Sequence, residues 1–179
     1  TLASGAVRMA RKKVIVKRIQ AGQTQWLAEL RRITVLFINL PDLSEGASLA
    51  KAQTAMQALQ TTLERFEGTI TRLGADDKGT AVLAAFGLPL LAHEDDPARA
   101  VQAALEIEAA LTREGMRGSI GITTGRAYCG VVGSSARHEY TMIGASVNLS
   151  SRLMQAAAGT REGVATLRAG NPRDESTDL

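Results

Sequence analysis

A short polar pattern in the last third of the chain contains residue types that handle nucleotides and phosphates. Asn148 and Arg152 are four residues apart, so a helix through this stretch places both on one face. An amide there can position a ribose, and a guanidinium can neutralise phosphate charge. Thr141 precedes them, and its hydroxyl can donate or accept a hydrogen bond at a base edge. An exposed polar helix face would explain the same pair, so the residues alone leave both interpretations open.

Three other groups of reactive side chains have simpler structural interpretations. His93-Glu94-Asp95-Asp96 contains metal-ligand types, but a loop and helix cap accounts for it better. His138 has no evident nucleophile arranged with it, which favours a structural, hydrogen-bonded role. Cys129 falls in a predicted strand and is expected to be a small core residue. The chain has no GxxxxGK[ST] loop, which disfavours a P-loop nucleotidase.

Length and composition predict one cytoplasmic domain with a packed core. The chain has 179 residues, of which 45% are hydrophobic, which suits one domain and argues against disorder. No apolar run reaches the roughly 18 residues that a membrane span needs, and no signal-peptide core is evident. A single cysteine cannot form an internal disulfide, so a reduced, cytoplasmic setting is expected.

The positive charge is concentrated before the predicted domain. Residues 1–32 contain eight Lys and Arg against one acid, a balance of +7, while the remaining residues sum to −4. Nucleic-acid binding usually pairs such a stretch with interleaved aromatic residues, and here only Trp26 is nearby. We therefore do not expect nucleic acid as a partner.

Apolar periodicity and turn signals outline the elements that must position the polar pattern. A β-branched apolar run predicts a buried strand, and an apolar stripe at three- and four-residue spacing predicts the first helix. Asp95 or Asp96 is expected to cap the second helix, with Pro97 in its first turn and Gly115 after its end. Its buried side is expected to include Val101, Ala104, Leu105 and Leu111. The expected elements are strand 33–40, helix 49–66, strands 69–73 and 81–86, helix 95–114, a hairpin of strands 119–124 and 126–132, and helix 145–157.

This order predicts an α+β, ferredoxin-like βαββαβ core with an added strand and helix. Residues 1–31 are predicted to form a basic connector, partly helical, and residues 32–158 the domain. Residues 159–179 have scattered Gly, Pro and charges without period, so we expect a polar and poorly ordered tail.

A longer motif around the polar pattern resembles a known family. The motif is Arg-x-x-Tyr-Thr-x-Ile-Gly-x-x-Val-Asn-x-x-x-Arg over 137–152, with Phe-Ile-Asn-Leu at 37–40 and Phe-Gly at 86–87 upstream. It is similar to the class III nucleotidyl cyclases over about residues 30–158. Within that family it most resembles the second catalytic domain of soluble, bicarbonate-responsive adenylyl cyclases. The features shared with that group are Trp-Leu-Ala-Glu-Leu-Arg at 26–31, Asp-Lys-Gly at 77–79 and His-Glu-Tyr-Thr at 138–141.

The resemblance implies an active site between two such domains, which converts ATP or GTP to the 3′,5′-cyclic nucleotide and pyrophosphate. By resemblance, Asn148 orients the ribose, Arg152 stabilises phosphate charge in the transition state and Thr141 contacts the base edge. Arg72 stands where the family often has a lysine that contacts adenine. Thr141 with Arg72 leans towards ATP, although an arginine in place of lysine weakens that assignment.

The sequence departs from the family at both metal-binding aspartates. Asn39 replaces the first, and a neutral amide is a poor ligand for Mg²⁺. Counting back from Phe86 places the second at Thr80, whereas counting forward from the preceding strand places it at Asp76, with Asp77 next to it. The backward count is preferred because strand pairing limits slippage. Two-metal phosphoryl chemistry needs charge at both ions.

Two functions follow from these departures. In the first, the chain is the base- and transition-state-side half of an adenylyl cyclase, inactive alone, whose homologous partner domain supplies both aspartates and so the Mg²⁺ or Mn²⁺. In the second, it is a catalytically inactive cyclase-like module for dimerisation or regulation. Family domains normally continue into further strands after the helix with Arg152. No such strands are evident here, so we expect a domain truncated at its C-terminal end.

Overall fold

The computed structural model describes residues 29–168, apart from 45, 77–78, 90, 135–136 and 159–163. For residues 76, 131–140 and 166–168 it describes the backbone alone. The elements in chain order are β1 (Glu29–Leu40), α2 (Leu49–Arg65), β2 (Thr69–Asp76), β3 (Gly79–Phe86), α3 (Asp96–Arg113), β4 (Ser119–Ser134), β5 (Arg137–Ile143), α4 (Ala145–Ala157) and β6 (Val164–Arg168).

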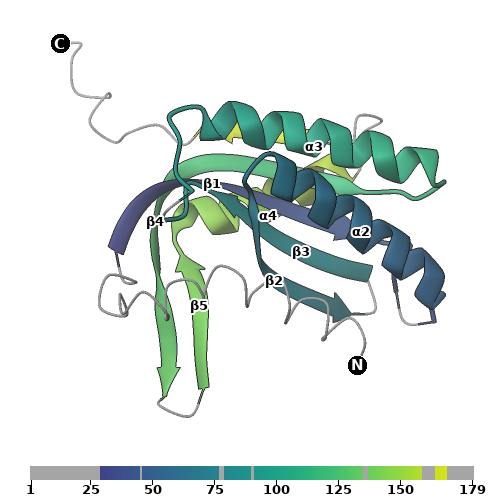
Figure 1. Ribbon diagram of the computed structural model, residues 1–179, viewed down its shortest axis with the longest axis horizontal. Helices are drawn as coiled ribbons and strands as arrows, with labels where there is room; N and C mark the ends of the chain where they lie inside the picture. The colour runs from purple at the N-terminus through teal and green to yellow at the C-terminus, as the bar shows by residue number, and fades with distance from the viewer. Residues whose placement is uncertain are drawn as a thin grey trace.

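Within these described residues, six strands form one mixed sheet (Figure 1). Five of them lie in the order β2-β3-β1-β4-β5, and β6 pairs with β4. Neighbouring strands are antiparallel except β4 and β6, which are parallel. The chain order from β1 to β4 is β-α-β-β-α-β, so the predicted α+β plan is confirmed.

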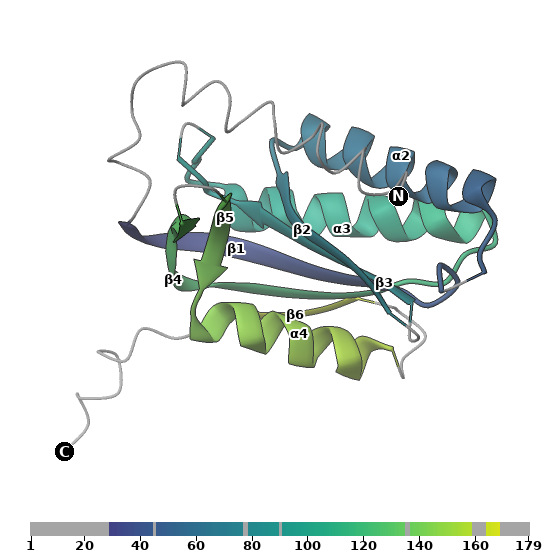
Figure 2. The same ribbon diagram turned by 90° about the horizontal axis from the view of Figure 1, so that it is seen from below.

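Helices cover both faces of the sheet, α2 and α3 on one and α4 on the other (Figure 2). The central strand β1 is buried on both faces, which explains its nearly continuous apolar run. Leu36 and Ile38 belong to the apolar cluster under α2 and α3, whereas Ile33 and Val35 belong to the cluster on the α4 side. Cys129 is fully buried in the second cluster, as predicted for a small core residue.

The helices begin close to their predicted starts. The Ser48 hydroxyl caps α2 by accepting a hydrogen bond from the Lys51 backbone N–H at 3.2 Å. Asp95 occupies the N-cap position of α3, but its side chain makes no capping hydrogen bond and pairs with Arg99 instead. The expectation that Leu105 is buried was wrong, because it is 54% exposed. None of the described helices is long and apolar enough to cross a membrane.

The predicted hairpin of strands 119–124 and 126–132 is wrong. Residues 119–134 form one continuous strand, β4, and the chain reverses between Ser134 and Arg137 instead. The reason is the length of β1, which pairs with β4 from Ser119 to Cys129. This uninterrupted ladder outweighs the turn tendency of Gly125, which lies opposite Ile33.

Both ends of the described domain extend beyond the predicted core. β1 begins at Glu29, inside the predicted connector, while residues 1–28 of that connector lie outside the described residues. Residues 164–168, predicted to be part of a strandless tail, form β6 beside residues 120–124 of β4. A short, weak strand pattern is sufficient here because the edge of β4 supplies a backbone partner. The rest of the tail lies outside the described residues.

Helix α4 lies directly against the backbone of β4. A Cβ atom added to Gly121 would collide with the Ser150 carbonyl oxygen and the Met154 backbone nitrogen, both in α4. The Thr123 hydroxyl also donates to the Ser146 carbonyl at 2.7 Å, near the start of the same helix. The position of α4 on the sheet therefore requires a residue without a side chain at 121.

We predict that Gly121→Ala lowers the free energy of unfolding by about 2–3 kcal/mol, because α4 must move away from the sheet. Urea unfolding measures this loss. Gly74→Ala is the matched control, since an added Cβ there meets nothing within 4 Å. Equal stability of the two variants would contradict the close contact between α4 and β4.

Candidate active site

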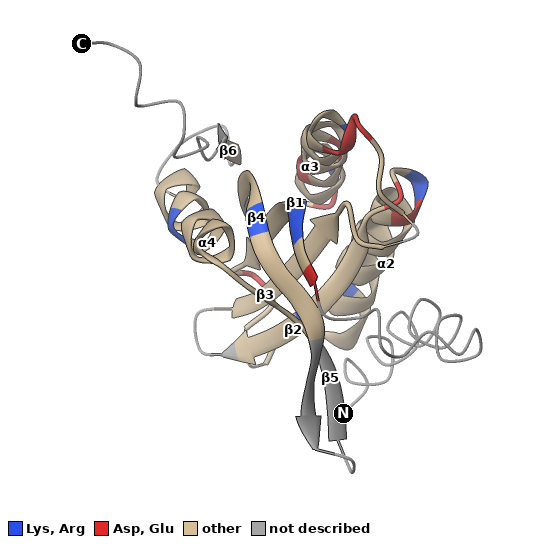
Figure 3. Ribbon diagram, turned by 90° about the vertical axis from the view of Figure 1, so that its left-hand side faces the viewer, with Lys and Arg blue, Asp and Glu red and all other residues tan. Residues whose placement is uncertain are grey.

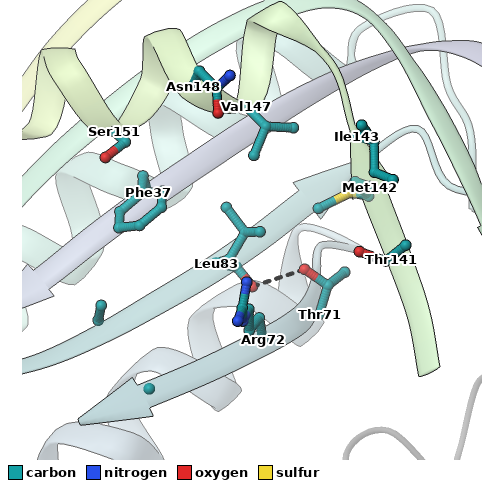
Figure 4. Close-up of a pocket in the computed structure, with 12 residues that line it drawn as sticks. Phe37, Thr71, Arg72, Leu83, Thr141, Met142, Ile143, Val147, Asn148 and Ser151 are labelled. Carbon is teal, nitrogen blue, oxygen red and sulfur yellow. Dashed lines mark hydrogen bonds between the residues drawn. The ribbon is translucent and has the colours of Figure 1, made fainter. Parts of the chain in front are cut away.

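An open pocket with a volume of about 650 Å³ lies on the α4 side of the sheet (Figure 4). Its walls come from the three strands β1, β2 and β3, from the end of β5 and from the first two turns of α4. Segments more than 100 residues apart in the sequence, such as Phe37 and Asn148, meet in it. It is therefore a product of the fold and not of any local motif.

The pocket brings together three of the four predicted site residues. Arg72 of β2, Thr141 of β5 and Asn148 of α4 all line it (Figure 4). The side chains of Arg72 and Asn148 are exposed, and that of Thr141 is half-buried. Arg152 lies one turn further along α4, exposed and outside the lining. Within the described part of the chain, no hydrogen bond or ion pair engages its guanidinium.

Apolar side chains that sequence reasoning did not assign to the site also line this pocket. Phe37 and Leu83 project from the sheet, and Val147 comes from α4 (Figure 4). Such a surface suits the flat face of a nucleobase. These residues look like ordinary core positions in the sequence. The sequence did contain one indication that Phe37 belongs to the site. Phe37 is two residues from Asn39, so both lie on the same face of their strand.

The two predicted positions for metal-binding aspartates do not fit a two-metal site. Asn39 lies opposite Ala81 and Ser119, on the α4 face of β1. It offers a neutral amide where a divalent ion needs a carboxylate. Thr80 lies opposite Leu40, and its hydroxyl donates to the Leu43 carbonyl at 2.8 Å.

Of the two alternative aspartates, the structure describes only Asp76, which ends β2. Asp76 pairs through its backbone with Gly79, and Asp77 lies outside the described residues. Among the described residues, no three His, Cys, Asp or Glu side chains group closely enough to hold a metal ion. Gly79 has a φ of 119°, and an added Cβ would lie 2.5 Å from the Leu40 carbonyl oxygen, so the hairpin packs closely on the end of β1.

An ion pair ties together the two loops beside this end of β1. Two nitrogens of the Arg117 guanidinium donate to one carboxylate oxygen of Asp42, at 3.1 and 2.7 Å. The backbone N–H of Arg117 donates to the other oxygen at 2.8 Å. Because these hydrogen bonds favour the ionised carboxylate, the pKa of Asp42 is lowered, and the pKa of Arg117 is raised by the same contact.

The residue His93 lies with its acidic neighbours where α2 ends and α3 begins, a region where Figure 3 marks both acidic and basic residues along the ribbon. Its Nε2 atom lies 3.0 Å from a carboxylate oxygen of Glu67, which also accepts from Arg99 at 2.8 Å. The Asp96 carboxylate accepts from the His93 backbone N–H at 2.9 Å. The loop interpretation of this stretch therefore fits the structure. The side chain of His138 lies outside the described residues.

The comparison with known proteins identifies the family. The profile of the adenylate and guanylate cyclase catalytic domain matches residues 27–166, so the chain belongs to that family. It is 36% identical over 146 residues to human adenylate cyclase type 10, an alignment that covers 78% of this chain. The same alignment covers 9% of the human protein, so the chain spans a small part of that relative's length.

Solved cyclase structures share the fold. The guanylyl cyclase Cya2 is 29% identical, with a TM-score of 0.61 over 72% of each chain. The adenylyl cyclase CyaB from P. aeruginosa is 22% identical, with a TM-score of 0.65 over 78% of each chain. The resemblance to class III cyclases and the predicted fold are thereby confirmed. Because one structure is a guanylyl and the other an adenylyl cyclase, the shared fold does not select the base.

We predict that Arg117→Ala lowers stability at pH 7 and that its deficit relative to the parent chain shrinks in acid. The folded pKa of Asp42 is depressed below the ordinary aspartate value of 3.8. The stabilisation from this ion pair is therefore present above that value and is lost as the pH falls through the lower, folded pKa. Urea unfolding at several pH values measures the difference. A deficit independent of pH would show that the Arg117 side chain acts by packing and not by charge.

Proposed function

We propose that this chain is the base- and transition-state-side half of an adenylyl cyclase, which converts ATP to 3′,5′-cyclic AMP and pyrophosphate. One observation supports this most strongly. Arg72, Thr141 and Asn148 line one pocket, while the positions expected for metal ligands hold Asn39 and Thr80. Cyclase domains of this family work as dimers, and a homologous partner domain would supply both aspartates, and with them Mg²⁺ or Mn²⁺.

Each polar residue has a distinct role in this proposal. Thr141 and Arg72 contact the edge of the base, whose flat face rests on Phe37 and Leu83. Asn148 hydrogen-bonds the ribose and fixes its orientation. Arg152, one turn further along α4 and without a protein partner in the described part of the chain, is free to neutralise phosphate charge that develops in the transition state.

Adenine suits the described lining better than guanine. Guanine presents N1–H and N2–H₂ donors on its pairing edge, and a carboxylate is the strongest acceptor for them. Among the described residues, none that lines the pocket carries a carboxylate. Adenine needs a donor for N1 and an acceptor for its N6 amino group, and Arg72 and Thr141 provide these. A cytoplasmic setting, where ATP is available, belongs to the same proposal.

The absent carboxylates favour a second candidate, an inactive cyclase-like module that pairs with another domain for regulation. Nucleotide dependence separates the two functions. An enzyme half binds ATP weakly through its own pocket and more tightly once its partner completes the site. A regulatory module pairs with its partner equally well with or without nucleotide.

In the complex with a domain that carries both aspartates, we predict that Arg152→Ala lowers kcat about 10²- to 10³-fold. KM and the association of the two domains should change little, because the guanidinium acts chiefly on charge that develops during the reaction. Steady-state assays of cyclic AMP formation with Mg²⁺ measure both constants.

Arg113→Ala is the control, since Arg113 is likewise exposed on a helix but in α3, remote in sequence from the pocket lining. This variant should keep full activity. If Arg152→Ala retained the parent kcat, Arg152 would have no part in the reaction, and the inactive module would be the better description of this chain.

A further inference from the structure

We propose that Thr71 is a positioning residue. Its side-chain hydrogen bond stabilises a β-bulge in β2, and the bulge holds Arg72 at the nucleotide pocket. The inference rests on the proposed function, because it assigns a purpose to the side chain of Arg72. It concerns a residue that does not itself have to touch the nucleotide.

The pairing of β2 with β3 contains one extra residue. Ile70 lies opposite Ala84 and Arg72 lies opposite Leu83, so the register shifts at Thr71. Two residues of β2, Thr71 and Arg72, therefore oppose one residue of β3, which is the definition of a bulge. Both of these consecutive residues line the pocket, which regular alternation along a strand would forbid.

The bulge decides which way Arg72 faces. Ile70 and Leu73 are three residues apart, yet both pack in the cluster under α2 and α3. Arg72 shares the opposite face with its partner Leu83, which belongs to the α4-side cluster. In an unbulged strand running on from the pair Ile70–Ala84, Arg72 would lie opposite Val82, which is fully buried under the helices. A guanidinium there would be desolvated without a partner.

The Thr71 hydroxyl fixes the bulge to the opposite strand. It donates to the Leu83 carbonyl at 3.1 Å, and Thr71 is 7% exposed (Figure 4). Leu83 is the residue that the bulge faces, so this side-chain hydrogen bond closes the irregular part of the ladder. Because the bond is buried, water does not readily replace it.

The consequence for function is specific to the base. The bulge fixes the backbone from which Arg72 extends, so it restricts where the guanidinium meets the ligand. Asn148 and Arg152 are carried by α4, a different element. Loss of the hydrogen bond from Thr71 to Leu83 should therefore weaken the contact of Arg72 with the base and leave the phosphate contacts unchanged.

The experiment measures the affinity of the full chain for ATP and for inorganic tripolyphosphate, which has no base, by NMR titration. Thr71→Val removes the hydroxyl at nearly constant volume, Thr71→Ala provides a second variant without it, and Thr71→Ser retains it. Arg72→Ala and the double variant Thr71→Val with Arg72→Ala complete a double-mutant cycle. Thr34→Val is the matched control. It also removes a buried hydroxyl, which makes a 2.9 Å hydrogen bond with the Thr124 hydroxyl, but on the face of the sheet opposite the pocket.

We expect Thr71→Val to weaken ATP binding about threefold to tenfold, with tripolyphosphate binding unchanged and Thr71→Ser near the parent. In the Arg72→Ala background, Thr71→Val should have no further effect. Equal loss for both ligands, or additive effects in the cycle, would overturn the inference by showing that Thr71 only stabilises the fold. If Arg72→Ala weakens ATP binding and neither Thr71→Val nor Thr71→Ala does, the role of Thr71 is wrong while the proposed base contact of Arg72 stands. If Arg72→Ala has no effect on ATP binding, both the proposed base contact and the role of Thr71 are wrong.

Discussion

The contact of α4 with the backbone of β4 at Gly121 is the constraint on which the rest of the structure depends. Since no side chain separates the two elements, α4 packs directly on β4. The neighbouring surface of β2 and β3 is left open. Gly144, just before α4, is also closely packed, although less severely, because an added Cβ would lie 3.0 Å from the Ala127 Cα atom. Both contacts hold α4, which carries Asn148, beside the pocket that Thr141 and Arg72 also line.

The pocket's chemistry comes from a few placed groups and not from net charge. The basic balance of the chain belongs to its N-terminal segment, of which Arg31 and Arg32 lie in β1. The residues that meet in the pocket offer hydrogen bonds and an apolar surface. The neutral amide of Asn39 also bears on the proposal, because the family resemblance implies a metal-binding carboxylate at this position and two-metal chemistry needs such a ligand. Together these features support the proposal that this chain supplies one side of a site shared between two domains.

The sequence predicted those parts of the fold in which local pattern and tertiary environment agree. The apolar run in β1 and the stripes on α2 and α3 are set by burial and were clear. The continuous β4 was missed because Gly125 signals a turn locally, while the long partner β1 keeps the strand extended. The bulge at Thr71 was missed as well, although the three-residue spacing of Ile70 and Leu73 in a strand is its signature. Residue types and spacing suggested Thr141, Asn148 and Arg152 as candidates, and the family resemblance supplied their roles and added Arg72. The apolar surroundings of these residues depend on contacts that sequence patterns do not contain.

The most direct measurement is the formation of cyclic AMP from ATP by the purified chain with Mg²⁺ or Mn²⁺, alone and after addition of a cyclase domain that carries both aspartates. If this chain is half of an active site, the chain alone forms no product above background at any concentration, and turnover appears once the second domain is present. Robust turnover by the chain alone would contradict the central claim, because it would show that Asn39 and Thr80 do not prevent this chain from completing an active site.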